Sequence, residues 1–291
     1  MTKGLLCSLL ASALFGYLYY FTTLLTPLSG LDALGFRILF MLPAVLAVLL
    51  LFKQQKRLVE HLTRIKQQPF LLLVVIFNAA MMGFQMWLYL WAPNNGSAVE
   101  VTVGYLLLPL VLVAFGKFLF KETISRYKAL AILCAGIAVL LNILLTGKMS
   151  WESLAVGLGY ALYFASRKFF KMNDLAVFTL EVSLLFPFCV YMVAQVNLNA
   201  AAELNPQIYL LVFLLGLISS IAFIAYILAS NWLPINLLGL LGYLETVAML
   251  FISLYIGETI QPASYPLLFG LSAAMLLLMY DGFRLRKKAL A

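Results

Sequence analysis

The chain consists of long apolar stretches separated by short polar breaks. A helix needs about 20 apolar residues to cross the hydrocarbon core of a bilayer. Ten stretches reach about that length: 4–26, 33–52, 70–91, 97–119, 127–146, 151–170, 174–195, 208–230, 234–255 and 263–281. Turn-forming sequences separate them, such as TPLSG at 26–30, PNNG at 93–96 and ELNPQ at 203–207. The pattern predicts an all-α membrane protein with ten transmembrane helices and no appended soluble domain.

Composition supports the same class of protein. Hydrophobic residues make up 65% of the 291 residues and charged residues only 10%, with a mean hydropathy of +1.04. Soluble domains carry about 25% charged residues. The first apolar stretch is too long for the core of a signal peptide, so we expect a retained first helix. The three cysteines show no pairing or metal spacing and are interpreted as packing residues.

The cations predict an orientation. With the N-terminus in the cytoplasm, the inside segments are 1–3, 53–69, 117–128, 167–173, 231–233 and 282–291. These segments hold 17 of the 19 Lys and Arg residues, because only Arg37 and Lys148 lie elsewhere. This asymmetry is typical of the positive-inside bias, so both termini are predicted to be cytoplasmic. It also accounts for the net charge of +8 without nucleic-acid binding. The lone His61, in KRLVEHLTRIK, is interpreted as a solvated loop residue.

A pattern that occurs twice indicates an internal repeat. Residues 104–124 read GYLLLPLVLVAFGKFLFKETI, and residues 242–260 read GYLETVAMLFISLYIGETI. Pro109 precedes Glu122 by 13 residues, and Glu245 precedes Glu258 by the same spacing. The matched helices are the fourth and the ninth, five helices apart, so the two copies run in opposite directions through the membrane. Inverted repeats are typical of secondary transporters, whose substrate site lies at mid-membrane between the halves.

Several segments resemble a known family. The run WLYLWAPNNGSAVEVTVGYLLLPLVLVAFGKFLFKETISR at 87–126 is similar to the RarD branch of the EamA, or drug/metabolite transporter, superfamily. Further similar segments are PLSGLDALGFRILF at 27–40, ALYFASRK at 161–168, TLEVSLLFP at 179–187 and LPINLLGLLGYLETVAMLF at 233–251. Two positions depart from the branch. Relatives commonly have His-Arg where this chain has Phe36-Arg37, and Glu-Pro or Gly-Pro where it has Glu245-Thr246.

The resemblance implies two inverted five-helix halves, at 1–147 and 148–291, in a bacterial inner membrane. It implies a central cavity lined mainly by the first, third, fourth, sixth, eighth and ninth helices. The implied function is secondary transport of small metabolites or drugs, usually outward, by a monomer or homodimer. No cofactor, metal or nucleic-acid partner is expected, and the implied partners are the small-molecule substrate and the lipid bilayer.

Four ionisable residues at membrane depth are candidates for coupling or gating, because a charge at a helix centre costs about 2.5–3.5 kcal/mol by insertion scales. Glu245 lies near the middle of its helix, where it could bind and release a proton or hold a substrate amine, or else form a structural hydrogen bond. Glu181 could serve transport or pair with Arg167 or Lys168. Arg37 and Glu100 lie near the predicted outer face, as an ion pair or as gate residues.

Neutral polar groups at helical spacing predict a substrate pathway. Aromatic rings with hydrogen-bonding tips suit a small, partly apolar solute. The candidates for substrate binding are Tyr17, Asn78, Gln85, Tyr89, Tyr105, Tyr160, Tyr163, Ser219, Tyr226 and Tyr243. Taken singly, each aromatic residue has an alternative role as an interfacial anchor or a lipid-facing residue. Gly104, Gly239 and Gly242, in the two matched helices, suit either close packing or bending during transport.

Other functions receive little support from the sequence. An intramembrane enzyme is not expected, because there is no GxSxG, no HExxH and no Cys–His pairing, and no catalytic residue is predicted. A P-loop is also missing, so direct use of ATP is not expected. Proton-independent facilitation, import, and passive conduction remain alternatives to coupled export, and proteoliposome counterflow distinguishes a carrier from a channel.

Overall fold

The fold is entirely helical within the part of the chain that the structure describes. The structure, a computed structural model, describes every residue except 1, 122, 148, 234 and 291, and only the backbone of 231, 235–240, 283 and 285–290. The long helices are α1 (Thr2–Phe21), α2 (Gly30–Leu51), α4 (Phe70–Trp91), α5 (Ala98–Phe120), α6 (Arg126–Thr146), α7 (Trp151–Phe169), α8 (Leu175–Gln195), α10 (Ile208–Trp232), α11 (Ile235–Tyr255) and α12 (Tyr265–Leu290). The short helices are α3 (Gln55–Gln67) and α9 (Leu198–Leu204), with 3-10 turns at Thr22–Leu25, Ala92–Asn94 and Pro262–Ser264.

Each of the ten predicted apolar stretches forms a helix. Among the described residues, eight helical segments are long and apolar enough to cross a membrane, and α7 and α11 are not among the eight. Within α11 the described apolar stretch is Leu241–Tyr255. Helix α7 contains Glu152, Tyr160, Tyr163 and Arg167, and it contacts both α4 and α5 inside the bundle. Contact with other helices allows α7 to be more polar than a lipid-exposed helix. The structure therefore confirms a multi-pass helical protein, whereas ten crossings stay a prediction.

Local sequence explains several helix ends. The predicted break at 26–30 ends in a capping box, in which Ser29 and Asp32 exchange hydrogen bonds at the start of α2. The side chains of Ser150 and Asp174 cap α7 and α8 by accepting hydrogen bonds from backbone N–H groups. Gly147 follows α6 with a φ of +74°, a conformation that favours glycine and ends the helix.

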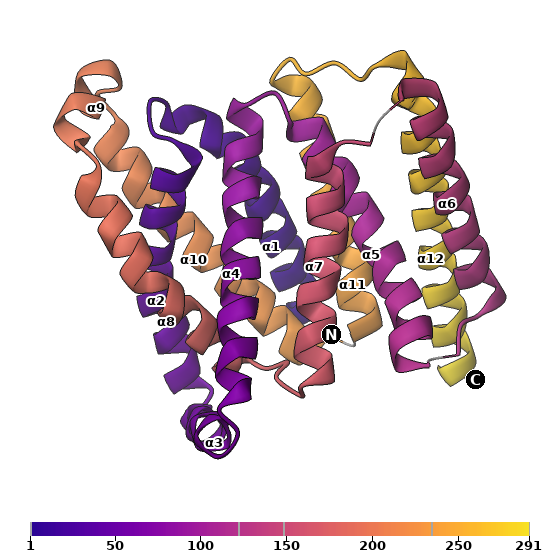
Figure 1. Cartoon of the computed structure of the whole chain (residues 1–291), viewed down its shortest axis with the longest axis horizontal. Helices are drawn as coiled ribbons and strands as arrows, with labels where there is room; N and C mark the ends of the chain where they lie inside the picture. Colours follow the sequence, from indigo (N-terminus) through magenta and orange to yellow (C-terminus); the bar gives the residue numbers. More distant parts are fainter. Residues whose placement is uncertain (1, 122, 148, 234, 291) are drawn as a thin grey trace.

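The contacts between helices are nearly the same for corresponding helices in the first and second five long helices. Helix α1 packs on α10 and α11, and α7, five long helices further on, packs on α4 and α5. The pairs α2 with α8, α5 with α11 and α6 with α12 each join corresponding long helices. In Figure 1, α6 and α12 lie together at one edge of the bundle, and α2 and α8 lie near the other.

Small residues set the close approaches between helices. A Cβ atom on Gly104 of α5 would lie 2.6 Å from the Cβ of Val156 in α7. In the corresponding pair, a Cβ on Gly16 of α1 would lie 2.9 Å from the Cβ of Ala248 in α11. Gly104 thus packs closely, which is one of the two roles considered for it, whereas a Cβ on Gly242 would meet nothing within 4 Å. The side-chain position of Gly239 lies outside the described residues, as do Glu122 and Lys148.

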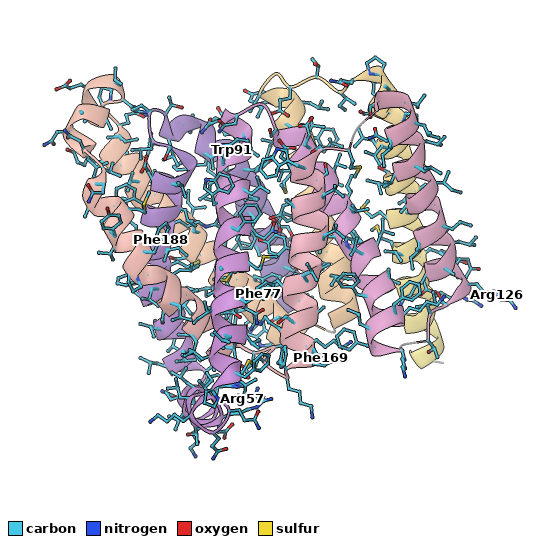
Figure 2. All side chains as sticks on the ribbon, viewed as in Figure 1. Arg57, Phe77, Trp91, Arg126, Phe169 and Phe188 are labelled. Atoms are coloured by element: carbon cyan, nitrogen blue, oxygen red, sulfur yellow. The ribbon has the colours of Figure 1, made fainter. Side chains whose placement is uncertain are left out.

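Helix α3 was not predicted, and it corrects the interpretation of His61. The helix lies across one end of the bundle and is seen end-on in Figure 1, where α1 begins and α12 ends at the same end. His61 is not a solvated loop residue: its Nε2 lies 2.7 Å from Asp174 Oδ2, and its side chain is 12% exposed. Figure 2 shows Arg57 and Arg126 toward this end and Trp91 toward the other.

Candidate functional site

A cavity of about 670 Å³ lies between the helices of the bundle. Its lining comes from α1, α2, α3, α4, α5, α7, α8, α10 and α11 and the segments between them. All six helices that the resemblance implies contribute to it, and α2, α3 and α8 are additional. The lining runs from Phe15, Tyr89 and Glu245 to Arg57 and Ser230 at the end that carries α3. The cavity therefore extends from the middle of the bundle to that end.

Tyrosines form a connected row along one wall of the cavity. The ring of Tyr89 lies 6.2 Å from that of Tyr105, which in turn lies 5.7 Å from Tyr160. Tyr160 and Tyr163 continue the row with ring centroids 6.4 Å apart. All four tyrosines line the cavity and come from α4, α5 and α7. The wall therefore offers flat apolar faces with hydroxyl groups to a bound molecule.

Two charged side chains of opposite sign face the same cavity. Arg37 of α2 is 5% exposed, its guanidinium carbon lies 5.7 Å from the centre of the Tyr89 ring, and its Nε has no hydrogen-bond partner. Glu245 lies ten residues into α11, about 15 Å along the axis at 1.5 Å per residue. The described ion pairs do not include either residue. Both charges are thus available to a bound molecule.

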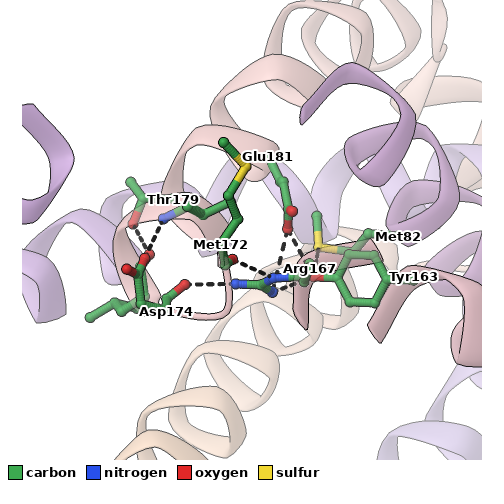
Figure 3. A network of polar contacts seen from close by, with 9 residues as sticks. Met82, Tyr163, Arg167, Met172, Asp174, Thr179 and Glu181 are labelled. Atoms are coloured by element: carbon green, nitrogen blue, oxygen red, sulfur yellow. Dashed lines mark hydrogen bonds and ion pairs between the residues drawn. The ribbon is translucent and has the colours of Figure 1, made fainter. Parts of the chain in front are cut away.

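A buried network supports the wall between the tyrosines and the α3 end (Figure 3). Arg167 donates to the Tyr163 hydroxyl at 2.5 Å, to the Met172 carbonyl at 3.0 Å and to the Asp174 carbonyl at 2.6 Å. Tyr163 donates to Glu181 Oε2 at 2.8 Å, and the same oxygen lies 3.6 Å from Arg167 Nη1. Glu181 is fully buried behind the lining, so the proposed salt bridge to Arg167 is present.

Five of the other sequence candidates lie either in the cavity lining or in the packing around it. Ser219, buried and without a hydrogen-bond partner for its Oγ, and Tyr226 both line the cavity. Asn78 is fully buried in α4 and its side chain has no partner. Gln85 donates to the Ala155 carbonyl at 2.7 Å and so joins α4 to α7. Tyr243 packs in an apolar cluster between α5, α6 and α12.

Tyr17 and Glu100 lie away from the cavity lining. Tyr17 is 43% exposed, and the centre of its ring lies 5.8 Å from that of Phe21. Glu100 lies in the first turn of α5, where its backbone carbonyl accepts a hydrogen bond from Ser153 of α7. The Arg37–Glu100 ion pair stays a prediction, and Arg37 lies in the central cavity.

Hydrogen bonds close the other end of the bundle. The Tyr89 hydroxyl donates to the Phe15 carbonyl and joins α4 to α1 at the inner limit of the cavity. Further out, Asn94 donates to the Thr22 carbonyl at 2.9 Å. Glu258, which follows α11, accepts hydrogen bonds from the backbone N–H groups of Ala98 and Val99 at the start of α5. The structure is thus open at the α3 end and closed at the other.

Several lining residues were missed by sequence reasoning. Met82 and Met86 line the cavity seven and three residues before Tyr89, so extending the predicted face of α4 would have found them. Arg57 and Asp174 line the cavity at the α3 end. They lie outside the regularly spaced polar positions of the spanning helices, so sequence spacing does not indicate them. Among the described residues, no group of three or more His, Cys, Asp or Glu side chains could hold a metal ion.

Comparisons with known proteins place the chain in a family. The model of the EamA-like transporter family matches residues 2–144. The chain is 55% identical to an uncharacterized transporter of Pasteurella multocida over 99% of both chains. It is 34% identical to the chloramphenicol-sensitive protein RarD of Pseudomonas aeruginosa over 98% of this chain and 96% of that one.

A solved crystal structure shares the fold. It aligns with 96% of this chain and 98% of its own length at a TM-score of 0.55 and 17% identity, which is a similarity of fold alone. The relatives are named as transporters, and the family is one of transporters and not of enzymes. On the sequence identity and the extent of these matches, the chain belongs to the EamA-like transporter family, in its RarD-like branch.

Proposed function

We propose that this protein is a secondary active transporter that exports small metabolites or drugs across the bacterial inner membrane by alternating access. The observation that carries the proposal is the 670 Å³ cavity, which opens at one end of a helical bundle and is lined by Arg37 and Glu245, two residues of opposite charge that are not part of the ion pairs among the described residues. A volume of about 300–1,000 Å³ is typical of sites for small organic ligands. The cavity is therefore large enough for a metabolite or a drug.

Two inverted halves, 1–147 and 148–291, form the moving parts in this proposal. The helix contacts support it, because α1 with α10 and α11 corresponds to α7 with α4 and α5. The paired sequence repeats at 104–124 and 242–260 support the same relation. The cavity lies between these halves, since its lining includes Arg37 and Tyr105 from one and Tyr160 and Glu245 from the other. Relative motion of the halves would alter access to it.

The open end faces the cytoplasm in this proposal. Helix α3, the start of α1 and the end of α12 lie at that end, and Arg57 and Arg126 lie toward it (Figures 1 and 2). Cytoplasmic segments carry an excess of Lys and Arg. A cavity open to the cytoplasm can load cargo there, which supports export.

The cargo that best matches the lining is a small solute with an aromatic or apolar part and charged groups. Arg37 can bind an anionic group through its unpartnered Nε, and Glu245 can bind a cationic one. The tyrosine row provides ring faces for the remainder of the molecule. Unpaired charges within the membrane are costly, so a solute that carries both complementary charges offsets that cost.

Glu245 couples transport to protons in this proposal. The equivalent residue in the first repeat is Pro109, which cannot be protonated. The repeat therefore places one titratable side chain at this depth and not two. A carboxyl group that faces an alternately accessible cavity can take up a proton on one side and release it on the other. Competition between that proton and a cationic cargo group at Glu245 would couple the two fluxes.

The test is Glu245→Gln in proteoliposomes, which mimics the protonated carboxyl group at nearly constant volume. The panel contains small aromatic amines, carboxylates and zwitterions, and chloramphenicol, which the name of the Pseudomonas relative mentions. We expect the parent to accumulate a panel compound against its gradient when a pH gradient is applied. Glu245→Gln should lose this accumulation but retain exchange. Glu203→Gln, an exposed carboxylate in α9 away from the cavity, is the control.

Two outcomes support the alternatives. Accumulation by Glu245→Gln at the parent level would remove the coupling role and indicate a proton-independent facilitator or importer. Flux without saturation and without counterflow would indicate a channel.

A further inference from the structure

Three segments that are distant in sequence meet at the closed end of the bundle. We call the meeting point of Tyr19, Ala98, Val99, Thr102, Ser253 and Glu258 the Glu258 junction. Glu258 Oε1 accepts from the N–H of Ala98 and Oε2 accepts from the N–H of Val99, both at 2.7 Å. Ala98 and Val99 are the first two residues of α5, whose N–H groups have no partner within the helix. Glu258 lies 160 residues away from Ala98 in the chain.

The backbone after α11 is shaped to present Glu258. Gly257 has a φ of +97°, a conformation that side chains strongly disfavour. Its N–H donates to the Leu254 carbonyl at 3.1 Å, and the Glu258 N–H donates to the Ser253 carbonyl at 3.1 Å. This turn ends α11 and directs the carboxylate toward α5.

Two further contacts make the junction more than a helix cap. The Tyr19 hydroxyl of α1 donates to the Ala98 carbonyl at 2.9 Å, and Tyr19 is fully buried. One turn further along α5, Thr102 Oγ1 lies 3.4 Å from Ser253 Oγ, and both residues are fully buried. The first half thus contacts the second half through α5 and the end of α11. Tyr19, Thr102 and Ser253 are shielded from solvent at this junction, whereas Glu258 is partly exposed.

We propose that Glu258 is the residue that holds this end of the transporter closed, and that its two hydrogen bonds to Ala98 and Val99 break whenever the cavity opens there. The proposal rests on the proposed function, because alternating access requires this end to open. Opening must separate α5 from the end of α11, since these segments meet across the two halves. Hydrogen bonds from backbone N–H groups to a carboxylate are charge-assisted and roughly twice as strong as neutral ones. Glu258 therefore biases the two-state equilibrium toward the state open at the α3 end.

The first experiment measures how often the junction opens, without any substrate. A chain with Cys7, Cys134 and Cys189 replaced by serine carries Ser253→Cys, and whole cells are treated with a membrane-impermeant maleimide. In the closed state the position is buried and labelling is slow. Adding Glu258→Gln removes one accepting oxygen and the negative charge. We expect labelling to accelerate about tenfold, equivalent to about 1.4 kcal/mol. Glu203→Gln should leave the rate unchanged.

A fold control uses the native Cys189, which is 1% exposed. In a chain that keeps only this cysteine, Glu258→Gln should not increase labelling, whereas partial unfolding would. An unchanged rate at Ser253→Cys, or an equal increase at Cys189, would overturn the proposal.

A second variant keeps the proposal testable if Glu258→Gln does not fold. The Thr102 and Ser253 γ oxygens lie 3.4 Å apart, so Thr102→Cys with Ser253→Cys can form a disulfide between the halves. Oxidation should stop exchange of the transported panel compound, and a reductant should restore it. Exchange that continues in fully cross-linked protein would contradict the proposal. If Glu258→Gln accelerates labelling but the parent protein transports no compound, the proposal for Glu258 would stand and the proposed transport function would be refuted.

Discussion

Replacing Arg167 with methionine should be among the most destabilising single changes in the membrane-embedded part of this chain. The guanidinium group donates to Tyr163, Met172 and Asp174 and lies 3.6 Å from Glu181. The side-chain exposure of Arg167 and Glu181 is 7% and 0%. Removing one partner of a buried ion pair costs about 3–5 kcal/mol, because the other charge remains buried without compensation. At about 2–4 °C per kcal/mol, the midpoint of thermal unfolding should fall by about 6–20 °C.

A double-mutant cycle in detergent separates this effect from loss of packing. Glu181→Gln retains an oxygen that can accept from Tyr163, so it should cost less than Arg167→Met. The double variant should be less destabilised than the sum of the two single variants by about 1–3 kcal/mol, since the residues are in contact. Arg126→Met is the matched control, because Arg126 is exposed at the start of α6 and should change stability by no more than about 0.5 kcal/mol. The reasoning would be refuted if the destabilisations of the two single variants added up to that of the double variant. It would also be refuted if Arg167→Met lowered the free energy of unfolding by less than about 1 kcal/mol.

Three further predictions concern packing, gating and topology. Gly104→Ala should destabilise the protein by about 1–3 kcal/mol, because the added Cβ would lie 2.6 Å from Val156. Gly136→Ala, where a Cβ meets nothing within 4 Å, should be neutral or stabilising in the same thermal assay. Exchanging the charges of Arg37 and Glu100 together tests the ion pair predicted from the sequence: more transport in the double variant than in either single reversal would support the pair. Equal losses in all three variants are expected if Arg37 binds cargo in the cavity instead. A reporter protein that functions only in the cytoplasm should be active when it is fused to the C-terminus. Activity of a C-terminal reporter that functions only outside the cytoplasm would reverse the proposed topology.

The helices of this protein follow from local sequence. Each apolar stretch is long enough to require internal backbone hydrogen bonding in a bilayer, and a helix provides it. Breaks such as 26–30 and 146–150 contain the serines and the glycine that cap the neighbouring helices. The polar wall was partly predictable as well, because Tyr89, Tyr160 and Tyr163 lie at helical spacings and do line the cavity. Glu245 stood out as a carboxylate in an apolar helix.

Tertiary structure decided which of those side chains meet. In lipid, a helix face that packs on protein is no more apolar than a face that packs on acyl chains, so hydrophobic periodicity does not show how a helix is rotated. For this reason Tyr17 and Tyr243 were predicted beside the cavity and lie away from it. The same lack of signal hid the approach of Glu258 to the start of α5, because that contact spans 160 residues. Sequence determined the helices and their polar candidates, whereas packing between the helices determined the cavity and the closed end.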